Sequence, residues 1–102
     1  MSRRAAHLGV TFLAFAALSL ASCAKPPGPA ECDALLDHYV ELLVNSDRPA
    51  TSAGELQKLQ VQARQKATHD PEFRDCSQRV SRRAYDCAMS ASNPDKLEQC
   101  LL

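Results

Sequence analysis

The sequence contains no Trp, only three Gly, and no excess of either charge: 12 Lys and Arg stand against 12 Asp and Glu in 102 residues. The even charge balance excludes the strongly basic surface of a dedicated nucleic-acid binder and the acidic run of a solvating tail. The length excludes more than one domain, and with it a cofactor held by a doubly wound sheet. We therefore expect one small domain that binds no nucleic acid.

Sequence patterns that carry chemistry are also absent. The chain has no Gly-rich phosphate loop, no pairing of a nucleophile with a base, and no Cys-x-x-Cys pair at the start of a helix. His38 and His69 have no cysteine at the spacing of about two to four residues that a structural zinc site requires. We therefore predict no catalytic residue, no metal site, no cofactor and no small-molecule substrate, and we do not expect an enzyme.

The N-terminal segment has the layout of a secretory signal. Basic residues at Arg3 and Arg4 precede an apolar stretch from Leu8 to Leu20. This stretch is too short to span a bilayer stably, and its position after basic residues is typical of an export signal. The sequence therefore predicts that the protein leaves the cytoplasm.

The residues at the end of the signal indicate its type. They read Leu20-Ala21-Ser22-Cys23, which resembles the lipobox of bacterial lipoproteins: an aliphatic residue, two small residues and a cysteine. The resemblance implies that residues 1–22 are cleaved as a signal peptide and that a lipid is attached to the thiol of Cys23. An ordinary signal peptide with an incidental cysteine is the alternative.

Two or three acyl chains on Cys23 are enough to hold a protein on a bilayer without a transmembrane helix. The lipidated cysteine and a Pro-rich tether would occupy residues 23–29, and the helical domain residues 30–102. An extended tether of this kind would hold the domain about 15–20 Å from the headgroups. Ala24 is not acidic, and in the lipoprotein family this favours the outer membrane over the inner one.

Apolar residues after the tether recur at helical spacing and not at strand spacing, which predicts an all-α domain. The first helix is expected over about residues 29–45. Ser52 and Glu55 have the spacing of a capping box and predict the start of a second helix, whose apolar face is the weakest of the set.

Two further helices are expected in the C-terminal half. Asp70-Pro71 predicts the start of a third helix, and the apolar register continues without a break to Ala91. Asn93-Pro94 repeats the combination of a cap and a proline, and predicts a short last helix. Three to four helices with short connections predict a small antiparallel bundle.

Four cysteines remain after Cys23, and an even number in a small exported chain predicts two disulfides with three alternative pairings. Cys76 and Cys87 lie about 16 Å apart on the predicted third helix, which is too far for a disulfide. Cys87 and Cys100 face each other across the predicted last turn. Cys32 lies near the start of the first helix and Cys76 near the start of the third, so both belong at the same end of the bundle. We therefore predict the disulfides Cys32–Cys76 and Cys87–Cys100.

Five residues form a candidate partner surface on the predicted third helix. Arg79, Arg82 and Arg83 make a basic cluster that suits lipid phosphates or another envelope polyanion, although an ion-paired surface in solvent explains the same residues. Tyr85 and Met89 are four residues apart and away from the main apolar face. They either contact an envelope protein partner or pack under the last helix.

These observations predict a membrane-anchored lipoprotein of the bacterial cell envelope, with the bilayer as partner through the acyl chains of Cys23. The chain resembles small bacterial helical lipoproteins with four cysteines, a group that implies no particular activity. A binding or structural role in the envelope follows best from the residues. A periplasmic redox factor or enzyme, and a small inhibitor or exclusion-type lipoprotein, are the alternatives.

Overall fold

The computed structural model describes residues 24–102, which contain six α-helices and no strand. The predicted all-α class is confirmed for this part of the chain. The predicted signal peptide, residues 1–22, and the predicted lipidation site, Cys23, lie outside the described residues. The helices are α1 (Pro29–Asp47), α2 (Ala53–Ala67), α3 (Pro71–Arg74), α4 (Cys76–Arg79), α5 (Arg82–Met89) and α6 (Pro94–Cys100).

Side-chain caps begin α2 and α6. Ser52 Oγ accepts a hydrogen bond from the N–H of Glu55 at 3.2 Å, and Asn93 Oδ1 accepts one from the N–H of Lys96 at 2.8 Å. Each bond satisfies a backbone donor that has no partner inside its own helix. α6 also begins with Pro94 in its first turn, where the missing N–H removes no helical bond. The predicted starts of these two helices are confirmed.

The prediction of one continuous third helix is wrong, because α3, α4 and α5 replace it. Val80 is extended, with φ −105° and ψ 121°, and Ser81 follows with φ −76° and ψ 161°. Ser81 Oγ accepts the N–H of Ala84 at 3.0 Å, so this serine starts a new helix and does not continue the old one. A second break lies at Asp75. The apolar spacing did not reveal the breaks because it runs across both of them.

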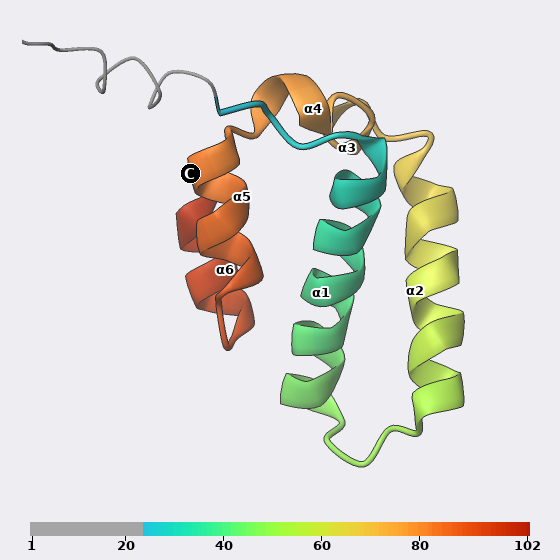
Figure 1. The fold of residues 1–102 in the computed structure, drawn as a ribbon. Helices are drawn as coiled ribbons and strands as arrows, with labels where there is room; N and C mark the ends of the chain where they lie inside the picture. The colour runs from blue at the N-terminus through green and yellow to red at the C-terminus, as the bar shows by residue number, and fades with distance from the viewer. Residues whose placement is uncertain (1–23) are drawn as a thin grey trace, which may run out of the picture.

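α1 lies between two groups of helices. α2 runs antiparallel to it on one side, and the pair α5 and α6 lies on the other (Figure 1). The short helices α3 and α4 cross the end of the molecule at which α1 begins and α2 ends (Figure 1). Residues 24–28 run along this same end. We call this region, made of residues 24–28, α3, α4 and the first turn of α5, the N-terminal end.

The most deeply buried side chains gather where α5 and α6 meet α1. Leu35, Ala88 and Leu97 form the core cluster, with exposed fractions of 5%, 0% and 1%. Tyr39 and Cys100 are partly buried and pack against this cluster. This cluster is small and lies on one side of α1, while Leu36 and Val44 of α1 are buried outside it, with exposed fractions of 7% and 8%.

α2 contributes no buried residue to the core. Polar contacts hold it against α1: Arg64 Nε lies 3.1 Å from Asp37 Oδ1, and the amide of Gln60 donates to the carbonyl of Asp37 at 3.0 Å. The prediction that this helix has the weakest apolar face is confirmed.

Candidate functional site

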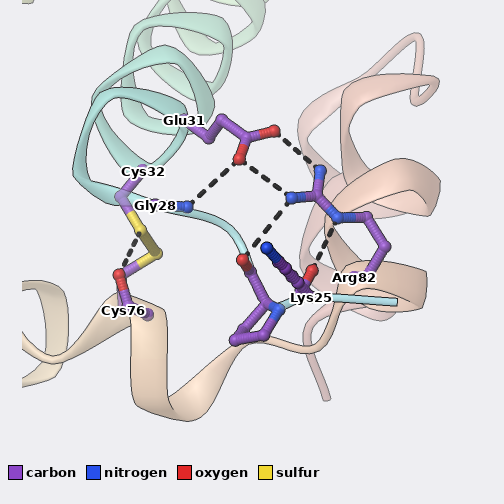
Figure 2. A network of polar contacts seen from close by, with 8 residues as sticks. Lys25, Gly28, Glu31, Cys32, Cys76 and Arg82 are labelled. Atoms are coloured by element: carbon purple, nitrogen blue, oxygen red, sulfur yellow. Dashed lines mark hydrogen bonds and ion pairs between the residues drawn. A yellow bond between two sulfur atoms is a disulfide. The ribbon is translucent and has the colours of Figure 1, made fainter. Parts of the chain in front are cut away.

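The segment that follows Cys23 is attached to the helical domain. Pro27 is less than 2% exposed. Arg82 Nε donates to the carbonyl of Lys25 at 2.9 Å, and its Nη2 lies 3.5 Å from the carbonyl of Pro26 (Figure 2). Residues 25–28 are therefore part of the folded domain, whereas the sequence predicts an extended Pro-rich tether within residues 23–29 and a domain that begins at residue 30.

Arg82 also pairs with Glu31 through two parallel hydrogen bonds. Nη1 donates to Oε2 at 2.7 Å, and Nη2 donates to Oε1 at 2.9 Å (Figure 2). The N–H of Gly28 donates to the same Oε1 at 3.1 Å. Two-pronged pairs between a guanidinium and a carboxylate combine charge with fixed geometry. We call Arg82, Glu31 and the backbone of residues 25–28 the arginine clamp.

The clamp shifts the protonation of both charged partners. The guanidinium of Arg82 and, after it, the N–H of Gly28 lower the pKa of Glu31 to about 2. The same pair raises the pKa of Arg82. Both groups are therefore charged at neutral pH.

The break before α5 places Arg82 where it can reach the N-terminal segment. Arg82 is the first residue of α5, directly after the cap residue Ser81. Its guanidinium carbon lies 5.2 Å from the ring centre of Tyr85, one turn further along, and a cation over an aromatic face is a favourable contact. Sequence reasoning included Arg82 in a surface cluster but missed its partner Glu31, because the two are 51 residues apart.

The structure divides the predicted partner surface. Arg82 is bound to Glu31 in the arginine clamp. Tyr85 and Met89 are half-buried and pack against the core cluster. Arg79 and Arg83 are exposed. The five residues do not form one continuous exposed patch, because the prediction assumed one continuous third helix and the chain forms α3, α4 and α5 instead.

The two disulfides join the predicted pairs. The Cα atoms of Cys32 and Cys76 lie 6.1 Å apart, and those of Cys87 and Cys100 lie 5.7 Å apart, both within the range of disulfides. The first links the start of α1 to the start of α4 beside the clamp (Figure 2). The second joins α5 to α6. Cys76 is buried, whereas Cys87 is exposed.

Two side chains of α1 fix the position of the last helical pair. Tyr39 donates its hydroxyl to Glu98 Oε2 at 2.8 Å, and His38 Nε2 lies 3.1 Å from the carbonyl of Ala91. Burial and, after it, the bond to Glu98 raise the pKa of Tyr39. The histidine that sequence reasoning weighed as a metal ligand thus lies within hydrogen-bond distance of a backbone carbonyl.

Within residues 24–102, no group of three or more His, Cys, Asp and Glu side chains is placed to hold a metal ion. No helix in the same range is long and apolar enough to cross a bilayer. Comparison with protein-family models, with curated proteins and with solved structures gave no match for this chain. The interpretation of function therefore depends on the resemblance of residues 20–23 to a lipobox and on the geometry around the arginine clamp.

The clamp predicts a specific acid dependence of stability. A carboxylate with a lowered pKa stabilises the folded state above its unfolded pKa, and this contribution is lost as the pH falls through the folded pKa. For Glu31 the window runs from the ordinary value of 4.5 down to about 2. We expect Glu31→Gln to lower the Tm at pH 7, and the gap from the wild type to narrow across this window, as measured by circular dichroism.

Glu41→Gln is the control for this measurement. Glu41 is exposed on the same helix, and no ion pair forms at its side chain among residues 24–102. We expect its Tm to follow the wild type at every pH. A gap for Glu31→Gln that stays constant from pH 7 to pH 2 would contradict the role of the clamp.

Proposed function

We propose that this chain is a lipid-anchored lipoprotein of the bacterial cell envelope with a binding or structural role. Residues 1–22 are cleaved, Cys23 carries the acyl chains, and the helices after it fold as one small antiparallel bundle. The acyl chains make the bilayer its first partner, and an envelope protein is the second. The outer membrane is the favoured location.

The observation that carries this proposal is the pair of disulfides in a domain that follows a lipobox almost directly. Disulfides form and persist in oxidising compartments outside the cytoplasm. The pairs Cys32–Cys76 and Cys87–Cys100 have disulfide distances and so favour an exported chain. Export is the step that the lipobox resemblance also implies.

Mass spectrometry of the intact protein from a bacterial envelope tests the proposal. We expect a chain that begins at Cys23, carries a lipid adduct on this residue and has four fewer hydrogens than the reduced chain. Cys23→Ser removes the thiol and is expected to lose the adduct and the membrane association. Ser22→Ala is the matched control, because it keeps a small residue before the cysteine and retains both. A soluble, unacylated mature chain would overturn the proposal.

A periplasmic redox role is the second candidate, and the exposure of Cys87 is the observation that favours it. Exposed disulfides are the ones that thiols attack most readily. Alkylation of the native protein distinguishes the two functions. Free thiols at Cys87 and Cys100 in the cell would support a redox factor, whereas two fully oxidised pairs support a structural role for the cysteines.

A further inference from the structure

We propose that the N-terminal end is a membrane-facing surface, on which Lys25, Arg79 and Arg83 contact the phosphates of anionic lipids. The inference rests on the lipid anchor of the proposed function. It adds the orientation of the domain on the bilayer and the lipid charge that it recognises.

The first argument is distance. Lys25 follows Cys23 by two residues, and two residues extend by at most about 7 Å. The arginine clamp holds the carbonyl of Lys25 on the domain at 2.9 Å. A free tether of the predicted length would allow about 15–20 Å between the domain and the headgroups. The clamp therefore prevents the domain from moving as far from the headgroups as a free tether would allow.

The distance between the domain and the headgroups decides whether basic side chains of the domain can attract anionic lipids. Electrostatic interactions in physiological salt fall off over a Debye length of about 8 Å. Cations at the end of a free tether would lie beyond this length for most of the time. The clamp brings the cations of the N-terminal end closer to the headgroups, because it holds this end against residues that follow Cys23 directly.

The second argument is the sign of the charge at this end. Lys25, Arg79 and Arg83 are exposed, and Figure 1 shows residues 24–28 running along the end that carries α4 and the first turn of α5. The negative charge of Glu31 is already paired with Arg82. Across α3, α4 and their cap residues, the acidic side chains outnumber the basic ones by one, namely Asp70, Glu72 and Asp75 against Arg74 and Arg79. Lys25 and Arg83 therefore give this end its excess positive charge.

The absence of Trp allows a direct test on the acylated full-length mature protein. Gln78→Trp places one fluorophore on α4 at the N-terminal end, and Gln57→Trp places one on α2. Both glutamines are exposed, so the two changes are matched. Gln57 lies ten residues before the end of α2, which is about 15 Å further from the N-terminal end. Energy transfer to dansyl-labelled headgroups reports the distance of each position from the bilayer.

We expect strong transfer from Gln78→Trp and weak transfer from Gln57→Trp on phosphatidylcholine vesicles that contain phosphatidylglycerol. The difference should shrink in high salt and on pure phosphatidylcholine. Each cation near an anionic surface favours the contact about fivefold. Lys25→Gln with Arg83→Gln is therefore expected to reduce the difference, whereas Arg48→Gln with Lys58→Gln, exposed at the other end, leaves it unchanged.

The outcomes separate this inference from the proposed function. Equal transfer from both positions on anionic vesicles, by protein that floats with them, overturns the membrane-facing surface and leaves the lipid anchor standing. A difference that neither salt nor the loss of Lys25 and Arg83 changes overturns the recognition of anionic lipids. Mature protein without an acyl chain overturns both the proposed function and this inference.

Discussion

Replacement of Cys32 and Cys76 by Ala lowers the Tm of the domain by about 20 °C, because this disulfide contributes about 4 kcal/mol through the loop that it closes. The two cysteines are 44 residues apart, so their link restricts more than half of residues 24–102 in the unfolded chain. The loop includes α2, which contributes no buried residue to the folded state. Thermal unfolding followed by far-UV circular dichroism measures the effect.

Replacement of Cys87 and Cys100 by Ala is the matched comparison. Their separation is 13 residues, and a loop of this size corresponds to about 3 kcal/mol. α5 and α6 also stay together through Ala88 and Leu97 of the core cluster. We expect the smaller loss of Tm here. A loss as large as that of the Cys32–Cys76 variant would contradict the dependence on loop length.

The cysteine pairing was predicted correctly although one step of its derivation is wrong. Cys76 and Cys87 were separated by assuming one continuous helix, and the structure breaks that helix at Asp75 and Val80. The pair Cys32–Cys76 survives because α4 starts at the end of the molecule at which α1 begins, and the pair Cys87–Cys100 survives because it depends on a local signal. Asn93 and Pro94 start α6 and turn the chain back, which brings Cys100 beside Cys87.

The arginine clamp could not be predicted in the same way. Periodicity identifies the face of a helix on which a residue lies, but not the residue that it meets across the fold. Arg82 contacts Glu31 and Lys25 at separations of 51 and 57 residues. The prolines of residues 24–28 were a correct signal of non-helical backbone. They gave no sign that this backbone supplies acceptors to a distant arginine.

Leu97→Ala is expected to lower stability by about 2–5 kcal/mol, because it removes a large side chain from a site that cannot collapse freely. Leu97 is 1% exposed and packs with Leu35 and Ala88 in the core cluster. The core is small, so one such cavity takes away much of the packing between α6 and α1. The corresponding fall in Tm is about 15 °C.

Leu43→Ala is the control, since it makes the same chemical change on α1 at a side chain that is 40% exposed. We expect a loss of about 0.5 kcal/mol, as is usual for surface positions. Repeating both variants without the Cys87–Cys100 disulfide separates packing from cross-linking. If the packing of Leu97 and the disulfide depend on each other, the stability lost in Leu97→Ala differs between the proteins with and without the disulfide. If they are independent, the two losses of stability add. No loss for Leu97→Ala in the oxidised protein would mean that the disulfide alone keeps α6 in place.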